Sequence, residues 1–280
     1  MLDHDVIARA AASLEPLSPT ASRLTALIAR EDVGIREIER AVALDPALTG
    51  KLLRVANSAA HGRQTAVGTV QAAVLHLGIG RVFSLAVAGS VRSRAQRALP
   101  ELGLSEGALW SHLVASALAI EVLPGVIRVP IPPEAFTAAL LHDVGKIVMV
   151  RFLDAETLRF LAEACALGPE EGTRAEREVL GVHHGEVSAL VAQEWRLPEP
   201  IVHAIAYHAF PDEAEDLVCD LVHVADVAAT RIGMPAGSAP LDVALQRGPA
   251  ERLRVTKAAF DDLLPRLGER FAEVSRHYLS

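Results

Sequence analysis

Apolar residues recur at intervals of three and four along most of this 280-residue chain, and β-branched or aromatic residues seldom occur at alternating positions. The first spacing places apolar side chains on one face of an α-helix, whereas alternation is typical of a strand. Ala and Leu, which favour helices, dominate, and only 4% of the residues are aromatic. The sequence therefore predicts an all-α fold, built almost entirely of helices.

Proline and glycine divide the first part of this pattern into short helices. Asp45 suits an N-cap, and Pro46 suits the first helical position, where its missing N–H costs nothing. Gly78 and Gly80 are expected to stop one helix before the next begins. The helices predicted here cover residues 20–30, 35–44, 45–59, 69–78 and 79–96.

A second helical block begins at Ser105, and a tail follows the segment "GMPAGSAPLD". The chain is long enough for one large core or for two lobes that share an interface. We therefore expect an N-terminal helical lobe over 1–104, a second helical lobe over 105–232 and a C-terminal helical extension over 233–280. The helices predicted in the last two parts cover about 105–123, 133–150, 154–167, 173–181, 184–196, 198–208, 215–232, 241–248 and 256–277.

Charge and composition exclude several classes of function. A net charge of −8 repels a polyanion, and the densest basic run, "RSRAQR" at 92–97, has no interleaved aromatic residues, so direct nucleic-acid binding is not expected. Apolar stretches such as 113–123 are too short to cross a bilayer, and the N-terminus does not resemble a secretory leader, which predicts a cytoplasmic protein with no membrane partner. Cys165 and Cys219 have no disulfide or zinc-finger spacing and are expected to be buried small side chains.

Histidines and carboxylates inside apolar helices are the main candidates for function. His112 is followed by small residues on its own helix face, His142 and Asp143 are adjacent in "LLHDVGKIVM", and Asp226 lies within "LVHVADVAAT". Nitrogen and oxygen ligands together suit a divalent transition metal. The alternative is that each histidine is a core residue whose ring nitrogens have hydrogen-bond partners within the protein. Spacing alone leaves both interpretations open.

Several motifs occur in the order typical of one family. The segments "LTGKLLRVANSAAHG", "VQAAVLHLGIGRVFSLAV", "LWSHLVASALA", "AALLHDVGKIVM" and "EREVLGVHHGEVSALVAQEWRLPEPIVHAIAYH" together resemble an HDOD domain over about residues 14 to 210. HDOD domains are output domains of bacterial signalling proteins and are related to the HD phosphohydrolases. The resemblance implies a multi-helical two-lobe HD-like bundle.

The resemblance also implies a set of metal ligands. The matching positions are His112, His142, Asp143, His184, His208 and Asp226. His184, rather than its neighbour His183, is assigned because it begins the motif "HGEVS". His223, three residues before Asp226, is compatible with ligation or with packing.

Ligands of a second metal ion are missing. Compared with the HD-GYP relatives, which hydrolyse cyclic di-GMP, Ala108 replaces a glutamate, Ala209 replaces the second of two histidines, and the "GYP" loop is absent. The resemblance therefore implies one divalent transition metal, such as Fe, Mn, Ni or Zn, rather than two. Lys146 could contact a phosphate group, or it could be an ordinary solvated lysine.

Three functions are compatible with these features. The first is a non-catalytic regulatory module that binds signalling proteins, or a second copy of itself, through its N-terminal lobe and its C-terminal helices. The second is a metal-dependent phosphohydrolase acting on a nucleotide or cyclic dinucleotide. The third is a sensor that binds a nucleotide without hydrolysis. The missing ligands favour the regulatory module.

Overall fold

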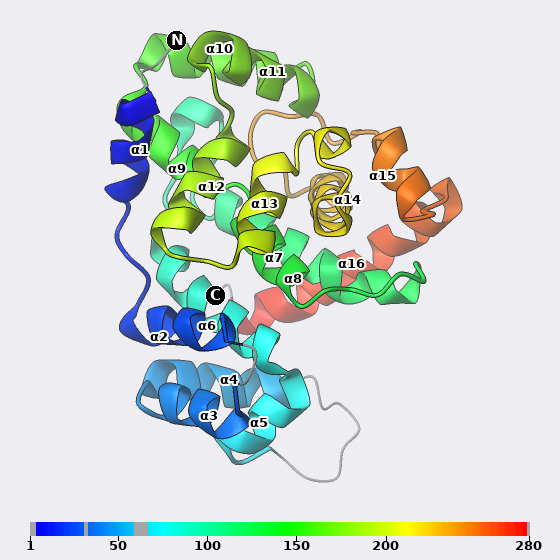
Figure 1. Cartoon of the computed structure of the whole chain (residues 1–280). Coiled ribbons are helices and arrows are strands. Elements are labelled where there is room, and N and C mark those ends of the chain that lie inside the picture. Colours follow the sequence, from blue (N-terminus) through cyan, green and yellow to red (C-terminus); the bar gives the residue numbers. More distant parts are fainter. Residues whose placement is uncertain (1–3, 31–32, 59–66, 279–280) are drawn as a thin grey trace.

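The computed structural model describes residues 4–30, 33–58 and 67–278, and helices form nearly all of the regular structure in these ranges. The only β-bridge within the described ranges joins Leu99 to Leu104, so the all-α prediction is confirmed. Figure 1 shows a smaller group of N-terminal helices beside a larger bundle. The N-terminal elements are α1 (His4–Ala12), α2 (Pro19–Ile28), α3 (Ile35–Ala43), α4 (Pro46–Ser58), α5 (Val70–Leu77), α6 (Ile79–Ala95) and the 3₁₀ turn η1 (Pro100–Leu102).

The rest of the chain forms most of the larger bundle. Its central helix, α7, contacts α8, α14 and α16. The elements are α7 (Ala108–Val122), η2 (Leu123–Gly125), α8 (Glu134–Leu141), α9 (Gly145–Phe152), α10 (Ala155–Cys165), α11 (Pro169–Leu180), α12 (His184–Glu194), α13 (Glu199–Tyr207), η3 (Pro211–Glu213), α14 (Leu217–Arg231), α15 (Arg247–Arg252) and α16 (Lys257–Tyr278).

The N-terminal helices begin and end largely where the sequence predicts. The carboxylate of Asp45 accepts a hydrogen bond from the backbone N–H of Leu48 (2.9 Å), as an N-cap does. Gly78, at φ +79°, lies between α5 and α6, which meet at 107°. Gly80 does not stop a helix. It lies in the first turn of α6, where a Cβ would approach the Cβ of Pro133 to 3.0 Å.

Helix α1 does not pack with the helices that follow it. It contacts α9 and α12 of the larger bundle, as Figure 1 shows, while α2 to α6 pack with one another. A single cluster of buried apolar residues extends through both groups of helices. The chain therefore crosses between the two groups early, and the division at residue 104 stays a prediction.

The expected helix over 133–150 is interrupted at the histidine–aspartate pair. Helix α8 ends at Leu141, His142 is its C-cap, and α9 starts at Gly145. Bonds of the i to i+3 type, such as Val144 N–H to Leu141 C=O (3.1 Å), replace the α-helical pattern there. The prediction that His142 and Asp143 lie within one continuous helix is therefore wrong.

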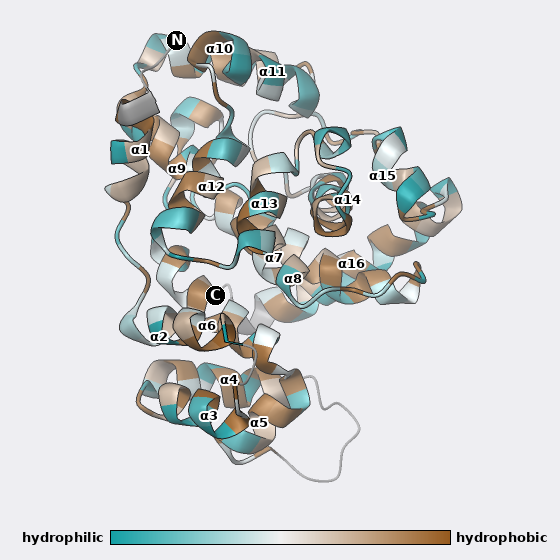
Figure 2. Ribbon diagram, viewed as in Figure 1, coloured by the Kyte–Doolittle hydropathy of each residue, from teal (hydrophilic) through white to brown (hydrophobic). Residues whose placement is uncertain are grey.

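Helix α7 lies deep in the core. Apolar residues surround it on nearly all sides, and Figure 2 shows this part of the bundle largely brown. The segment Ala108–Gly125 is long and apolar enough to cross a membrane, contrary to the expectation that the apolar stretches are too short. However, 67% of that segment is buried inside the fold, which is typical of a core helix.

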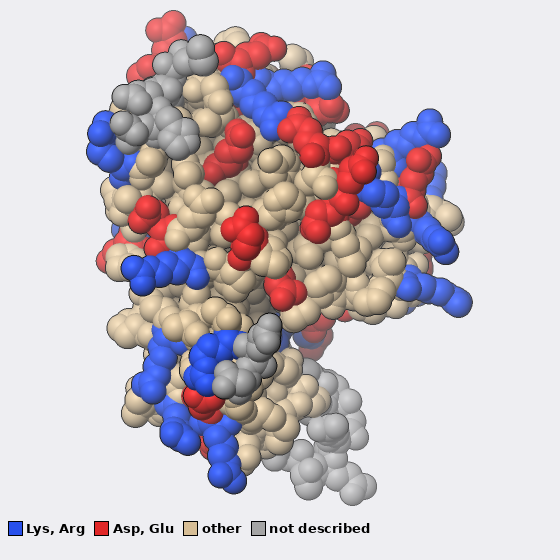
Figure 3. All heavy atoms as spheres, in the orientation of Figure 1, with Lys and Arg blue, Asp and Glu red and all other residues tan. Residues whose placement is uncertain are grey.

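The tail packs against the larger bundle through α14 and α7. Residues 241–246 are not helical, so the helix predicted over 241–248 is wrong, while α16 matches the helix predicted over 256–277. Arg252 of α15 binds both carboxylate oxygens of the buried Asp220 (2.7 and 2.8 Å), which anchors the tail to α14. Both signs of charge are spread over the face in Figure 3, with acidic groups between α11 and α15 and basic groups near α2 to α4.

Candidate metal centre

Four buried histidines from four different places in the fold each hold one ring nitrogen in a fixed contact. Because a backbone carbonyl or a carboxylate can only accept, each contact fixes a proton on Nδ1. The other ring nitrogen, Nε2, is then left with a free lone pair. The Nδ1 contacts are His112 to Met234 C=O (2.7 Å), His142 to Ala139 C=O (2.7 Å), His184 to the Glu176 carboxylate (2.7 Å) and His208 to Ile205 C=O (2.8 Å).

The four Nε2 atoms converge. His112 Nε2 lies 3.1 Å from His142 Nε2, and His184 Nε2 lies 3.3 Å from His208 Nε2. The rings of His142 and His208 connect the two pairs, with centroids 4.7 Å apart. Helices α7 and α12 therefore contribute one imidazole each to a single centre, and the C-cap residues of α8 and α13 contribute the other two.

Asp143 lies between the two pairs of rings. Its Oδ1 is 3.2 Å from His184 Nε2 and 3.9 Å from His208 Nε2, and its Oδ2 is 3.7 Å from His112 Nε2 and 3.8 Å from His142 Nε2. The break between α8 and α9 makes this possible, because it turns Asp143 toward the rings beside His142. The carboxylate is only 2% exposed.

Asp226 supplies a second carboxylate from α14. Its Oδ1 lies 3.3 Å from His112 Nε2 and 3.8 Å from His142 Nε2. Its side chain is 25% exposed, so it forms part of the wall between the centre and a cavity. All six residues expected as ligands are thus brought together by the fold.

The two carboxylates carry negative charge in this centre. Burial raises the pKa of Asp143, but Lys146 and the neighbouring histidines outweigh this effect and hold the pKa well below its usual range. Burial also raises the pKa of Asp226, but the adjacent rings of His112 and His142 outweigh burial and hold the pKa well below its usual range. Both groups therefore offer oxygen lone pairs at neutral pH.

The histidines differ in their tendency to take up a proton. Burial lowers the pKa of His142, but Asp143 and then Asp226 outweigh burial, so the pKa is raised. Burial, together with the positive charge that His142 and His184 can carry, lowers the pKa of His208 well below its usual value. Without a metal ion, a proton on His142 can fill the space between facing lone pairs, whereas His208 stays neutral.

The arrangement fits a divalent metal ion. Two nitrogen ligands about 2.1 Å from one ion and at right angles to each other would be about 3 Å apart, close to the two Nε2 distances. Asp143 Oδ1 is buried and has no hydrogen-bond donor among the described residues, which is costly unless a cation contacts it. Among the described residues, the clusters able to hold an ion include His112, His142 and Asp226, and also His142, Asp143 and His208.

Lys146 is engaged within the protein. Its ammonium donates to Asp143 Oδ2 (2.7 Å) and to the carbonyl of Ala236 (2.9 Å). Burial lowers its pKa, but Asp143 outweighs burial and raises the pKa above its ordinary value. Lys146 is therefore not an ordinary solvated lysine, and it has one N–H left for a ligand.

Glu176 is a part of the centre that the sequence did not predict. The same oxygen, Oε2, accepts from the Nδ1 and from the backbone N–H of His184 (2.7 and 2.8 Å). Glu176 lies in the amphipathic helix α11, where a glutamate in a charged pattern gives no signal of a buried role. Only the packing of α11 against the start of α12 identifies it.

His183, His203 and His223 lie outside the converging set. His183 caps α12, and burial and the adjacent His184 lower its pKa to about 2. His223 donates from Nδ1 to the carbonyl of His208 (3.1 Å), and its Nε2 accepts from Gln246 N–H (3.4 Å), so both ring nitrogens are used in packing. His203 stacks near Tyr207 instead.

A cavity of about 270 Å³ leads to the centre. Asp143, His184, His208 and Asp226 lie at its inner wall. The carboxylates of Glu170, Glu171 and Asp242 line it further out, and Lys146 is its only cationic residue among those described. Glu170 is paired with Arg174 (2.6 Å) and Asp242 with Arg231 (3.0 Å), so only part of this negative charge is without a counter-ion.

Comparison with known families decides the relationship. The HDOD domain matches residues 14–211. The chain belongs to the HDOD family. The chain is also similar to a protein of Treponema pallidum (strain Nichols), with 25% identity over 182 residues, or 65% of this chain. The match spans 34% of that relative's length.

Solved structures have the same fold. An HDOD domain protein from Geobacter sulfurreducens covers 99% of this chain and all of its own, with 21% identity and a TM-score of 0.72. A candidate signal transduction protein from Marinobacter aquaeolei VT8 has 20% identity and a TM-score of 0.71, covering 95% of this chain and 59% of its own. A candidate phosphohydrolase from Shewanella amazonensis SB2B has 23% identity and a TM-score of 0.63, covering 93% and 97%. These TM-scores show a common HDOD-like helical fold.

Proposed function

We propose that this HDOD chain is a metal-binding signalling module that acts through binding rather than hydrolysis. One observation carries the metal part of the proposal: four imidazoles, each with its proton fixed on Nδ1, direct their Nε2 lone pairs toward Asp143 and Asp226. Partners that hold Nδ1–H are typical of metal-binding histidines. Core histidines would instead be expected to satisfy Nε2 as well.

The residues that would hold one ion are the four histidines and the two aspartates. Mixed nitrogen and oxygen ligands suit Fe, Mn, Ni or Zn. Glu176 and the carbonyls of Met234, Ala139 and Ile205 orient the rings. When bound, such an ion would supply Lewis acidity and lower the pKa of a coordinated water molecule.

Three features argue for binding without hydrolysis. Ala108 and Ala209 provide no side-chain ligand for a second ion. The carboxylate of Glu171 lines the cavity without an ion pair among the described residues, and it disfavours a phosphodiester there. The ammonium of Lys146, the cation that could attract a phosphate, already pairs with Asp143 at 2.7 Å.

Hydrolysis of a phosphodiester is the second candidate function. The observation in its favour is the cavity itself, which places Asp143 and Asp226 within reach of a small molecule. The remaining N–H of Lys146 would then contact a phosphate oxygen, as the sequence suggests. A nucleotide bound in this cavity without hydrolysis would use the same contacts.

The partners that we propose are other signalling proteins or a second copy of the chain. The name of the Marinobacter neighbour, a candidate signal transduction protein, supports this role. The helices α2 to α6 and the tail helices α15 and α16 supply no residue of the metal centre, so their outer surfaces are available for contacts. A cytoplasmic location belongs to the same proposal.

The test is metal analysis of the purified protein, followed by a phosphodiester assay with and without added Mn²⁺. We expect about one ion per chain in the wild type and little in His142→Ala and Asp143→Ala. The matched control is His203→Ala, which removes a histidine outside the centre. Metal without turnover supports the binding module, turnover that depends on His142 and Asp143 supports hydrolysis, and equal metal content in all variants overturns the metal site.

A further inference from the structure

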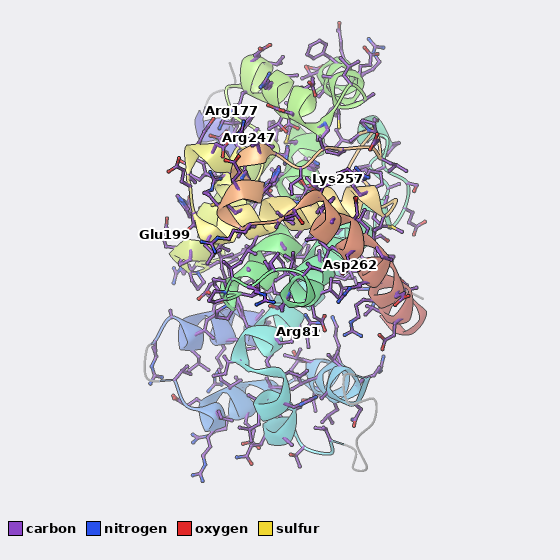
Figure 4. All side chains as sticks on the ribbon, turned by 90° about the vertical axis from the view of Figure 1, so that its right-hand side faces the viewer. Arg81, Arg177, Glu199, Arg247, Lys257 and Asp262 are labelled. Atoms are coloured by element: carbon purple, nitrogen blue, oxygen red, sulfur yellow. The ribbon has the colours of Figure 1, made fainter. Side chains whose placement is uncertain are left out.

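A second cavity lies at the junction between the N-terminal helices and the larger bundle, away from the metal centre. It has a volume of about 80 Å³ and is lined by residues of α4, α6, α7, α8 and α16. Figure 4 labels Arg81, one of its lining residues, where the N-terminal helices meet the green helices. None of the residues that form the metal centre lines it.

The charge of this cavity is unbalanced. Its lining contains the cations Lys51, Arg81, Arg92 and Arg270, and no Asp or Glu among the described residues. Glu121, which lies outside the lining, is already bound by Arg81 (2.8 Å) and Arg270 (2.9 Å). Arg270 also pairs with Glu273 (2.7 Å), so two carboxylates balance Arg81 and Arg270, and the other two cations are left.

Lys51 and Arg92 remain without a counter-ion. Neither the ammonium of Lys51 nor the guanidinium of Arg92 forms a hydrogen bond or ion pair within the described part of the chain. Both side chains are half-buried. Burial, together with the like charge of Arg92, lowers the pKa of Lys51 to about 8. Placing two like charges in one partly desolvated cavity costs free energy, and an anion between them would offset it.

Trp110 provides an independent observation in the same cavity. It is 5% exposed, and its indole N–H has no acceptor in the described residues. A buried donor without an acceptor is rare in native proteins and calls for a missing partner. Apolar side chains, including Val114, Leu118 and Phe136, form the rest of the wall.

We propose that this cavity binds a small organic anion, with its carboxylate or phosphate between Lys51 and Arg92 and a short apolar body against Trp110 and Phe136. The volume limits the occupant to a small molecule of about one ring and its acidic group, since one ordered water needs about 10–15 Å³ of such space. The occupant contacts helices of both groups. Its binding therefore stabilises the packing of α4 and α6 against α7, α8 and α16. The signalling module would then respond to a ligand at a site separate from its metal centre.

The test uses the full chain with benzoate and phenyl phosphate as probes at constant ionic strength. Benzamide, which resembles benzoate without its charge, and inorganic phosphate, which lacks the apolar body, are the comparison ligands. Binding is measured by titration calorimetry and by the rise in melting temperature. We expect saturable binding of at least one probe, with weaker binding of both comparison ligands.

The variant Lys51→Gln/Arg92→Gln should bind the probe at least about tenfold more weakly, because both charge contacts are lost. It should also melt at a higher temperature than wild type without the probe, since the unbalanced charge is removed. The matched control is Arg54→Gln/Arg97→Gln, which makes the same change in net charge at exposed positions on or next to the same two helices. It should bind like wild type.

Two further variants separate this proposal from the metal site. Trp110→Phe keeps an aromatic ring but removes the indole N–H, and should weaken binding of the probe several-fold. His142→Ala disrupts the metal centre and should leave probe binding unchanged. Absence of saturable binding by both probes, equal binding in the Lys51→Gln/Arg92→Gln variant, or loss of binding in His142→Ala would each overturn the proposal.

Discussion

His112 and His142 direct their Nε2 atoms toward each other across 3.1 Å, while the Nδ1–H of each ring donates a hydrogen bond to a backbone carbonyl. Two lone pairs at this distance repel unless a proton or a metal ion lies between them. The carbonyls of Met234 and Ala139 prevent the rings from turning to relieve the contact. The fold therefore maintains a binding position for a cation.

Replacing His112 with asparagine tests this position directly. The amide nitrogen of asparagine can take the place of Nδ1 and keep the bond to Met234, whereas nothing takes the place of Nε2. Without metal, we expect the free energy of unfolding of the variant to lie within about 1 kcal/mol of the wild-type value. We also expect the variant to lose the rise in melting temperature that a divalent metal produces. Full stabilisation by metal in His112→Asn would count against His112 as a ligand. His203→Asn is the control.

Glu176 should act as a positioning residue through His184. Glu176→Gln keeps the shape of the side chain but removes the charge that holds the Nδ1 proton of His184. We expect metal affinity to fall by about 10- to 100-fold, the range found for residues that orient metal-binding histidines. Metal titration calorimetry measures this, with Glu178→Gln, at an exposed position of the same helix outside the cavity, as control. Equal affinities in the two variants would contradict the assignment.

The close packing of α9 on α12 should tolerate no side chain at Gly145. A Cβ there would lie 2.6 Å from the backbone nitrogen of Ser188, whose hydroxyl accepts from Gly145 N–H (2.8 Å). We expect Gly145→Ala to lower the free energy of unfolding by at least about 1–3 kcal/mol, because backbone must move. Urea denaturation measures this change.

Gly89 provides the opposite case. It is exposed within α6, and a Cβ there would contact nothing within 4 Å. Gly89→Ala should therefore raise the free energy of unfolding by about 0.5–1 kcal/mol. A loss at Gly145 no larger than the change at Gly89 would show that α9 can shift away from α12.

Lys51 should make stability depend on pH in the alkaline range. Its pKa is about 8 in the folded chain, because of burial and then Arg92, against 10.5 as the ordinary value. Between these values the unfolded chain binds a proton that the folded chain does not, so the free energy of unfolding rises with pH. Discounted for solvent access, the gain is about 1–2 kcal/mol by pH 10.5.

The comparison with Lys51→Gln isolates this effect. Arg81, Arg92 and Arg270, the other cations of the cavity, do not titrate in this range. Urea midpoints of wild type and Lys51→Gln, measured from pH 7.5 to 10.5 without organic anions, should therefore converge as pH rises. A constant difference across the range would show that Lys51 keeps its ordinary pKa.

Sequence by itself determined the helical fold and, through its motifs, the family, and the resemblance to that family predicted the six residues of the candidate metal centre. Helical spacing and the Pro and Gly joints are local signals, since each depends on residues within a few positions. Polar residues such as His112 and Asp226 in apolar helices are conspicuous in one dimension, because burying them without partners is costly.

Only the tertiary structure decided how these residues are held and what lies around them. In the structure, the helix is interrupted at His142 and Asp143. Glu176 contacts His184, and Lys146 forms an ion pair with Asp143. The fold also placed Lys51 and Arg92 in one cavity, although 41 positions of chain separate them. Contacts between distant segments depend on how whole helices pack. The residues around each such side chain therefore do not indicate which distant residue it will contact.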